Sequence, residues 1–269
     1  MRLSVSENGE DFVEPIVVGT PKEFALGMDE FKKAYQTLTK GKQVEICAGG
    51  IRRLNPEKEA ILPDFRLPDW SGKPLKSELQ KITGATVLLE NDTALVGLGE
   101  AVKGAGKGYP IISYFTISTG VGGVRIVNGK IEPSRFGYEP GHQIIDLDWS
   151  KFPSLKDMES EGFGQLEAYL SGTAMEKRFG KPPREITDEG IWDEMNFMVA
   201  VSLNNAIAFW SPDMIVLGGG MMGTPGISVD GVKGHLGKLV KIFPSIPEVK
   251  KALLGDFGGL HGALVFAKG

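Results

Sequence analysis

The chain has 269 residues, of which 30 are Lys or Arg and 34 are Asp or Glu, so its formal net charge is −4. With a sequence pI near 5.6, this balance argues against a surface dedicated to nucleic acid or to anionic membranes. No apolar run approaches the roughly 18 residues of a membrane span, and the start shows no secretory signal pattern. We therefore expect a cytoplasmic protein with neither a nucleic-acid nor a membrane partner.

The apolar fraction of 41% and the charged fraction of 24% are those of a globular protein that is long enough to bury a large core. The single cysteine, Cys47, rules out an intramolecular disulfide and any cysteine-based zinc site. The 37 glycines are numerous, and they gather beside the polar segments that carry the candidate chemistry.

The first part of the chain opens with a predicted hairpin, because Asn8-Gly9 is a turn signal between two strand-like runs. Thr20-Pro21 then opens a helix, since Thr caps well and Pro suits the first turn. The pattern predicts strands at 1–6, 12–18, 44–48 and 86–89, and helices at 20–40, 74–83 and 92–102.

A glycine-rich connection at 104–109 predicts a domain boundary. After it, the pattern predicts strands at 111–118, 124–127 and 214–217, and helices at 166–179, 191–210 and 258–267. Strands and helices alternate in two blocks, so we infer an α/β protein of two lobes.

Glu90-Asn91-Asp92 ends an apolar run and begins a helical pattern. A carboxylate at such a strand end suits a general base that takes a proton from a substrate hydroxyl, while the Asn91 amide fixes a neighbouring hydroxyl. The alternative is that Asp92 only caps its helix. These residues alone leave both interpretations open.

The segment Ser-Thr-Gly-Val-Gly-Gly at 118–123 lies between two predicted strands. Its glycines let backbone N–H groups approach phosphate oxygens, and Thr119 adds a hydroxyl donor. It is neither a Walker A loop nor a dinucleotide fingerprint, because the residues that define those motifs do not follow. Leu-Gly-Gly-Gly at 217–220 ends another strand and would let a flat ring or a ribose lie against the backbone.

Glu139 and His142 stand three residues apart in a predicted turn, where they can together hold adjacent hydroxyls of a polyol. The alternative for His142 is a structural histidine, and a zinc role would need ligands that the chain lacks. Glu167, for its part, is also explained as a first-turn acid favoured by the helix dipole.

Taken together, these segments make the chain similar to the ROK family of sugar kinases and sugar-responsive repressors. The similarity covers nearly the whole chain and rests on ENDTA at 90–94, STGVGG at 118–123 and EPGH at 139–142, together with GQLEAYLSGTA, IVLGGG and GDFGGLHGALVFA. It implies a two-lobed actin-like ATPase fold, related to ribonuclease H, with an active-site cleft between lobes 1–103 and 104–257. It also implies that the last helix, 258–269, packs back on the first lobe, and that the protein is a homodimer.

The resemblance further implies transfer of a phosphoryl group from ATP, with Mg²⁺, to a sugar hydroxyl. By position, Asp92 matches the catalytic base, which also contacts the sugar, and the further sugar ligands are matched by Asn91, Glu139, His142 and Glu167. Thr119 and Gly120 match the phosphate-binding hairpin, and Gly218 and Gly219 match the glycines beside adenosine.

Two stretches depart from the family pattern. Many members carry a zinc-binding cysteine cluster just before the Leu-Glu that Leu166-Glu167 matches, whereas residues 158–165 contain no cysteine. We therefore expect no zinc, so that another group must orient His142. The family also normally opens with a strand that ends in Asp-x-Gly-Gly-Thr, and residues 1–6 resemble the strand after it. We therefore expect the natural product to begin about ten residues upstream.

The sequence thus predicts an ATP-dependent kinase of a hexose or hexosamine, with Asp92 as general base. The competing interpretation is a catalytically inactive sugar-binding or regulatory protein on the same fold, which the missing Asp-x-Gly-Gly-Thr favours. A DNA-binding repressor is disfavoured, because the chain is not basic and no helix-turn-helix pattern precedes the sugar lobe. The predicted sugar ligands fit several hexoses, and the loop 49–70 is expected to contribute to the choice between them.

Overall fold

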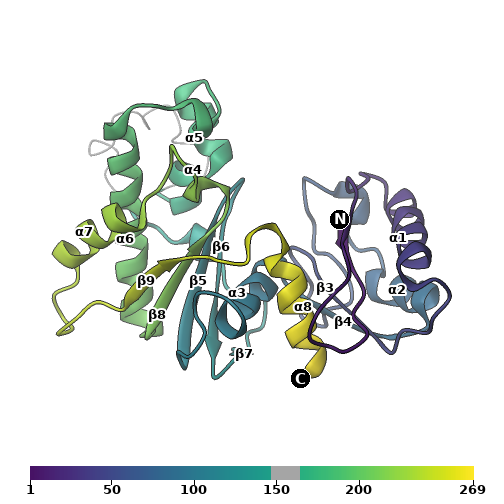
Figure 1. Ribbon diagram of the computed structural model, residues 1–269. Helices are drawn as coiled ribbons and strands as arrows, with labels where there is room; N and C mark the ends of the chain where they lie inside the picture. The colour runs from purple at the N-terminus through teal and green to yellow at the C-terminus, as the bar shows by residue number, and fades with distance from the viewer. Residues whose placement is uncertain (147–163) are drawn as a thin grey trace. The chain divides into compact units, whose positions relative to one another are not determined.

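The structure is a computed structural model that describes residues 1–146 and 164–269. The chain divides into two compact units, each built from segments that are distant in sequence (Figure 1). Unit 1 comprises Met1–Lys103, Pro133–Gly137 and Leu254–Gly269, and unit 2 comprises Gly104–Glu132 and Tyr138–Leu253. In the part of the chain that is described, no helix combines the length and the apolar character needed to cross a membrane.

Unit 1 contains a short antiparallel pair of strands, a parallel pair of strands, and four described helices around them. Its elements are β1 (Arg2–Leu3), β2 (Ile16–Val17), α1 (Phe24–Thr39), β3 (Ile46–Gly50), α2 (Leu75–Thr83), β4 (Thr86–Glu90), α3 (Asp92–Val102) and α8 (Gly258–Lys268). The core of the unit is formed by Phe24, Met28, Leu54, Ile61, Trp70, Leu75, Leu79, Val87 and Leu89.

Helix α1 begins four residues later than the sequence predicts. The predicted cap, Thr20, is replaced by a residue from a distant loop, because the backbone N–H of Phe24 donates to Asp69 Oδ2 at 2.8 Å. Asp69 belongs to a short 3-10 turn, Pro68–Trp70, whose Trp70 ring packs edge-on against the ring of Phe24. The start of the helix is therefore set by a tertiary contact rather than by its own sequence.

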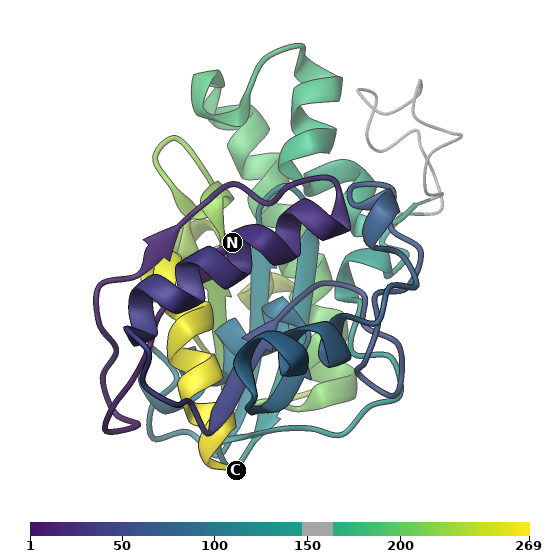
Figure 2. The same cartoon turned by 90° about the vertical axis from the view of Figure 1, so that its right-hand side faces the viewer.

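Helices α3 and α8 lie against each other with little space between their backbones. A Cβ atom added at Gly262 of α8 would lie 1.7 Å from the carbonyl oxygen of Leu95 in α3, so only glycine fits at this crossing. Figure 2 shows α8, in yellow, beside the purple N-terminal segment of the same unit. The C-terminal end of the chain thus completes the unit that the N-terminal end begins.

Unit 2 is built on a five-stranded sheet in the order β7-β6-β5-β8-β9, in which β5, β8 and β9 are parallel and β5, β6 and β7 are antiparallel (Figure 1). Its elements are β5 (Ile111–Ile117), β6 (Val121–Val127), β7 (Lys130–Ile131), α4 (Leu166–Leu170), α5 (Gly172–Phe179), α6 (Glu189–Trp210), β8 (Met214–Gly218), α7 (Val229–Leu239) and β9 (Glu248–Lys251).

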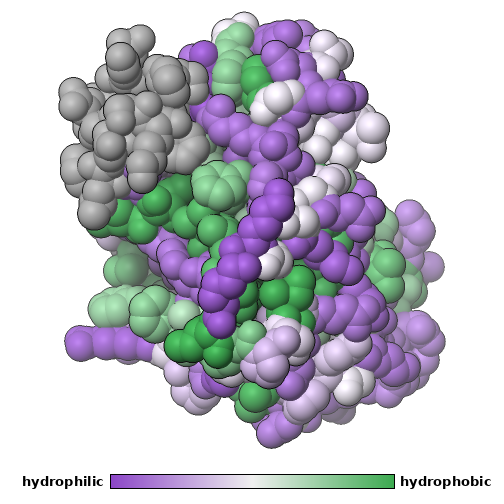
Figure 3. Space-filling model, turned by 90° about the vertical axis from the view of Figure 1, so that its left-hand side faces the viewer, coloured by the Kyte–Doolittle hydropathy of each residue, from purple (hydrophilic) through white to green (hydrophobic). Residues whose placement is uncertain are grey.

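The core of unit 2 joins the sheet to the helices, with α6 contributing the largest share of its side chains. The apolar positions of α6 predicted from its spacing are all buried, namely Met195, Met198, Val199, Leu203 and Ile207. On the face of the molecule seen in Figure 3, hydrophobic and hydrophilic side chains are interspersed. The most exposed large apolar side chains of the unit are Phe209, at 84%, and Ile242, at 83%.

Two boundaries in unit 2 differ from the prediction. The glycine turn after β5 is tighter than expected, because β6 already begins at Val121 and carries Gly122 and Gly123 of the motif within the strand. The helix predicted over 166–179 is broken in two at Ser171, which leaves the helical conformation and caps α5 by accepting from the N–H of Ala174. Ser followed by Gly172 favours this restart over a continuous helix.

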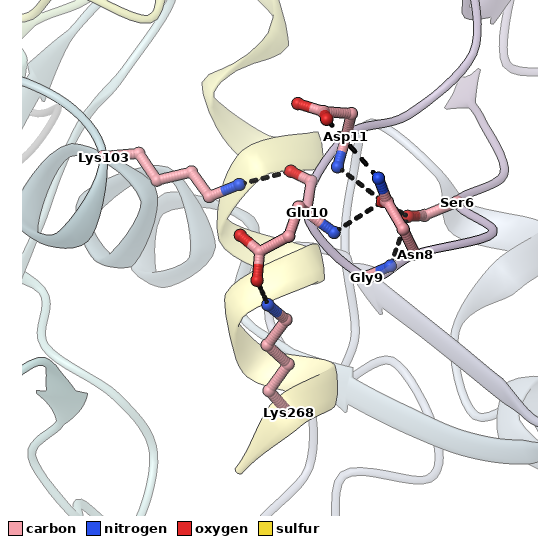
Figure 4. Close-up of polar contacts among 7 residues, drawn as sticks. All are labelled: Ser6, Asn8, Gly9, Glu10, Asp11, Lys103 and Lys268. Carbon is pink, nitrogen blue, oxygen red and sulfur yellow. Dashed lines mark hydrogen bonds and ion pairs between the residues drawn. The ribbon is translucent and has the colours of Figure 1, made fainter.

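The turn between β1 and β2 is held in unit 1 by the ends of two helices (Figure 4). Within the turn, Asn8 Oδ1 accepts from the backbone N–H groups of Glu10 and Asp11, as expected for an Asx turn. From outside, Lys103 Nζ donates to the Glu10 carbonyl at 2.5 Å, and Lys268 pairs with the Glu10 carboxylate. Such side-chain bonds compete with a β ladder, so the strands are shorter than the predicted 1–6 and 12–18.

Candidate active site

The parallel strands β3 and β4 bring the predicted base to a strand edge in unit 1. Their register pairs Gly50 with Glu90, so both strands end at the same edge, and Asn91 and Asp92 follow directly. Gly50 lies against this junction so closely that an added Cβ atom would be 2.9 Å from Asp92 Cα. The backbone around Asp92 is therefore packed in place by the neighbouring strand.

Asn91, not Asp92, caps helix α3. Asn91 Oδ1 accepts from the N–H of Ala94 at 3.1 Å, and Asp92 is the first helical residue. The interpretation of Asp92 as the helix cap is therefore wrong. The exposed Asp92 carboxylate accepts only from its neighbour Thr93 among the described residues.

Glu90 supports the segment that carries Asn91 and Asp92, a role that sequence reasoning missed. Its carboxylate is buried, accepts from the backbone N–H of Asn91 at 2.8 Å, and pairs with Lys58 from the loop after β3. Burying a carboxylate is costly unless such partners bond to it. The acidic residue is visible in the motif, but its partner comes from a distant loop that no local pattern could identify.

In unit 2, the carbonyl groups at the tip of the β5–β6 hairpin accept hydrogen bonds, whereas the N–H groups of Thr119 and Gly120 do not donate to any described residue. Gly172 N–H donates to the Ser118 carbonyl at 2.6 Å, and Thr173 Oγ1 donates to the Thr119 carbonyl at 3.1 Å. No described residue accepts from the backbone N–H of Thr119 or Gly120. Two adjacent free N–H groups can donate to one anion, so the tip has the donors that a phosphate-binding role would require, and that role stays a prediction.

Glu167 is brought to this hairpin by helix α4. Its Oε2 accepts from the backbone N–H of Val121 at 2.7 Å. A Cβ atom added at Gly120 would lie 2.7 Å from the same oxygen, so the glycine makes room for the carboxylate. The structure thus places a predicted sugar ligand in contact with the predicted phosphate hairpin. Oε2 is committed to Val121, and Oε1 is paired with no described residue.

The Glu-Pro-Gly-His turn packs against the same hairpin. Residues Pro140–His142 form a 3-10 turn, and an added Cβ at Gly141 would lie 2.3 Å from the Val121 carbonyl oxygen. The turn is closed by the N–H of His142, which donates to the Glu139 carbonyl at 3.0 Å. The exposed His142 ring is bonded through Nδ1 to Gln165 Oε1 at 2.8 Å. Glu139, His142 and Glu167 therefore belong to one continuous part of unit 2.

Gln143 attaches this turn to helix α6 and was not predicted. Its Nε2 donates to the Pro140 carbonyl at 2.8 Å and to Ser202 Oγ at 2.7 Å, while its Oε1 accepts from Asn205 Nδ2 at 2.9 Å. All polar atoms of this amide are thereby used within the fold. Because the two partners in α6 lie about 60 residues away in sequence, no local motif reveals that contact.

The glycines at the end of β8 pack against β5. An added Cβ at Gly218 would lie 2.5 Å from the Tyr114 hydroxyl oxygen, so the space that this glycine leaves is filled by Tyr114. Gly219 adopts φ +95°, a conformation that favours glycine, and lies against the Ile117 carbonyl. Both glycines are required by the fold itself, whatever they contact in a complex.

No group of three or more His, Cys, Asp or Glu side chains is arranged to hold a metal within residues 1–146 and 164–269. The prediction that no zinc is bound rests on residues 158–165, which contain no cysteine. Of these residues, the structure describes only Gly164 and Gln165. The absence of zinc therefore stays a prediction. What the structure does add is the group that orients His142, which is Gln165.

Residues 20–269 match the family described as ROK family. Along the sequence, the chain is 27% identical over 290 residues to the N-acetyl-D-glucosamine kinase of Shigella flexneri serotype 5b, covering 97% of this chain and 93% of the relative.

Two solved structures share the fold. The ROK hexokinase from Thermus thermophilus has a TM-score of 0.80 at 24% identity and covers 97% of this chain and 92% of its own. The ROK family glucokinase from Streptomyces griseus, in complex with glucose and AMPPNP, has a TM-score of 0.76 at 23% identity, with coverages of 99% and 95%. The predicted α/β fold of the actin-like ATPase class is confirmed. Since the family match extends from residue 20 to the last residue, the chain belongs to the ROK family.

Proposed function

We propose that the protein phosphorylates a hydroxyl group of a hexose or hexosamine, with ATP as phosphoryl donor and Asp92 as general base. The observation that carries the proposal is the exposed Asp92 carboxylate at the first position of α3. Because Asn91 caps the helix, this carboxylate is not used as the cap. Membership of the ROK family and the similarity to an N-acetyl-D-glucosamine kinase support the reaction class.

The sugar would be held by amide, carboxylate and imidazole groups. Asn91 uses its Oδ1 in the helix cap, which leaves its Nδ2 to donate to a hydroxyl. Glu139, His142 and Glu167 supply further acceptors, and for Glu167 the oxygen not bonded to Val121 is the one available. These groups fit several hexoses and hexosamines, so the assay must identify the substrate.

The phosphates of ATP would be bound by the free N–H groups of Thr119 and Gly120, and adenosine would lie near Gly218 and Gly219. The Streptomyces griseus relative, in complex with AMPPNP, supports ATP as the donor. Mg²⁺ in phosphoryl-transfer sites takes most of its ligands from phosphates and water and needs only one or two carboxylates. We therefore propose that it enters with ATP and neutralises phosphate charge there.

In the proposed reaction, the sugar oxygen forms a bond to the γ-phosphorus of ATP while its proton passes to the Asp92 carboxylate. The bond from the γ-phosphorus to the bridging oxygen breaks, and ADP leaves with the electron pair. Asp92 then releases the proton to water. Most of the rate enhancement in such transfers comes from positioning and electrostatic stabilisation, so the backbone supports of Asp92 and of the hairpin are part of the mechanism.

The second candidate is a sugar-binding or regulatory protein without turnover. A coupled ADP-release assay with Mg²⁺-ATP across glucose, mannose, fructose, N-acetylglucosamine and N-acetylmannosamine separates the two, when combined with calorimetry of sugar binding. The proposal predicts ADP release that depends on one of these sugars. Sugar binding without any sugar-dependent ADP release would instead establish the second candidate.

We also propose a homodimer, as the family resemblance implies. The exposed apolar side chains of Phe209 and Ile242 are the candidates for burial between subunits, because covering them would remove apolar area from water. Light scattering of the eluted protein tests the oligomeric state. A mass of about 29 kDa at micromolar concentration, equal to that of one chain, would contradict the dimer.

A further inference from the structure

His142 and Gln165 form a hydrogen bond that fixes the protonation pattern of the imidazole. The distance from His142 Nδ1 to Gln165 Oε1 is 2.8 Å. An amide oxygen can only accept, so the proton must reside on Nδ1. In the neutral ring the other nitrogen, Nε2, is then an acceptor. The hydrogen bond to Gln165 thus determines the tautomer of His142.

The backbone on both sides of Gln165 is hydrogen-bonded to the segment that follows His142. The residue before it, Gly164, accepts from the N–H of Ile145 at 2.8 Å, and the residue after it, Leu166, donates to the Gln143 carbonyl at 3.0 Å. Segments 142–145 and 164–166 therefore run beside each other with their backbones bonded. These backbone bonds hold the main chain of Gln165 beside His142.

The side chain of Gln165 does not cap the helix that it precedes. Gln165 occupies the N-cap position of α4, yet its side chain makes no capping bond and turns to His142 instead. Two residues further along the same helix start, Glu167 bonds to the β5–β6 hairpin. One short segment thus supports the His142 ring and one of the acids proposed to bind the sugar.

We propose that Gln165 is a positioning residue that holds His142 in the Nδ1–H form, so that Nε2 accepts a hydrogen bond from the substrate. The inference rests on the proposed function, because it takes His142 as a sugar ligand, and it specifies what His142 recognises. An acceptor at Nε2 selects a donor, either a sugar hydroxyl or the N–H of an acylated amino group. It rejects a group at that position that can only accept.

The test is nitrogen-15 NMR of the full chain labelled at histidine, recorded at pH 8, where neutral rings are observed. The chain has only three histidines, so comparison with His142→Ala assigns the His142 signals. The wild type is expected to show the Nδ1–H tautomer at His142. Gln165→Leu should lose it, because the acceptor is gone and the Nε2–H form that predominates in free histidine returns.

Sugar affinity gives the second readout. In Gln165→Leu the dissociation constant should rise about tenfold, as expected for loss of one oriented hydrogen bond. The kcat value should change much less than KM, because Gln165 acts only through sugar binding. Gln165→Glu retains an acceptor and should keep the Nδ1–H signal. The control for replacing a glutamine by leucine is Gln80→Leu, because Gln80 is an exposed residue of α2.

Three results decide the inference. An Nε2–H tautomer in the wild type would overturn it, and so would an Nδ1–H signal that persists in Gln165→Leu. Equal sugar affinity in the wild type and in folded Gln165→Leu would overturn the role in recognition. If the wild type binds no sugar at all, the proposed function fails first, and the tautomer measurement shows separately whether the His142–Gln165 bond exists.

Discussion

The carboxylate of Glu167 accepts a hydrogen bond at 2.7 Å from the backbone N–H of Val121, the first residue of β6. This contact joins helix α4 to the hairpin whose tip, at Thr119 and Gly120, has free amide groups. In the proposed reaction Glu167 binds the sugar, and the hairpin backbone binds the phosphates of ATP. The hydrogen bond from Val121 to Glu167 therefore connects the two proposed binding sites of unit 2.

Replacing Glu167 should therefore affect both substrates. Glu167→Ala leaves the Val121 N–H without its partner, and we expect both the sugar and the ATP KM values to rise and the free energy of unfolding to fall by about 1–3 kcal/mol. Glu167→Gln retains an acceptor oxygen for Val121, so its ATP KM should stay closer to that of the wild type. An ATP KM unchanged in the folded Ala variant would show that the hairpin does not depend on Glu167.

Asp92 should be needed for turnover and not for folding. We expect Asp92→Asn to lower kcat by about 10²–10⁴, the usual contribution of a general base, while calorimetry still detects sugar binding. The matched variant is Asn91→Ala, which removes the helix cap and should cost about 1 kcal/mol of stability. Near-normal turnover in Asp92→Asn would remove this residue from the role of base.

The turn that carries Glu139 and His142 depends on close contact with β6. In Gly141→Ala the new Cβ would meet the Val121 carbonyl oxygen at 2.3 Å, and because backbone cannot yield easily we expect about 1–3 kcal/mol of destabilisation and weaker sugar binding. Gly234→Ala is the control, since this exposed glycine of α7 has open space and should gain about 0.5–1 kcal/mol. Urea unfolding of both variants tests the difference, and similar stabilities would refute the close packing.

Burial raises the pKa of the Cys47 thiol from 9.0 to about 11. Since only the thiolate reacts, alkylation of the folded protein at pH 8 should be about 100-fold slower than in denaturant. The unfolded chain releases this proton from about pH 9 and the folded chain only near pH 11, so the contribution of Cys47 to stability declines between these values. Equal alkylation rates in folded and unfolded protein would contradict the burial of this thiol.

The sequence predicted those elements best whose signals are local. Helix α3 has the predicted limits, because a buried strand and a capping residue define its start. By contrast, α7 was not predicted, since Gly231, Gly234 and Gly237 weaken the helical pattern. Strand β9 was missed because its four residues contain one apolar side chain, and only pairing with β8 makes them a strand.

In the candidate site, sequence reasoning supplied the residues that carry the proposed chemistry but not those that support them. Glu139, His142 and Glu167 were selected from motifs, and the structure brings them onto the β5–β6 hairpin. Lys58, Gln143 and Gln165 were not selected, because each acts through a partner more than twenty residues away or through segments that only the fold brings together. Single polar residues in loops carry no local signal of such contacts.

The most direct test of the account is phosphorus NMR of Mg²⁺-ATP mixed with the full chain and the sugar that it binds best. We expect resonances of ADP and of one sugar phosphomonoester that grow together with the wild type and do not appear over the same time with Asp92→Asn. Unchanged ATP alongside sugar bound to the wild type would contradict it and would identify the protein as a sugar-binding protein without kinase activity.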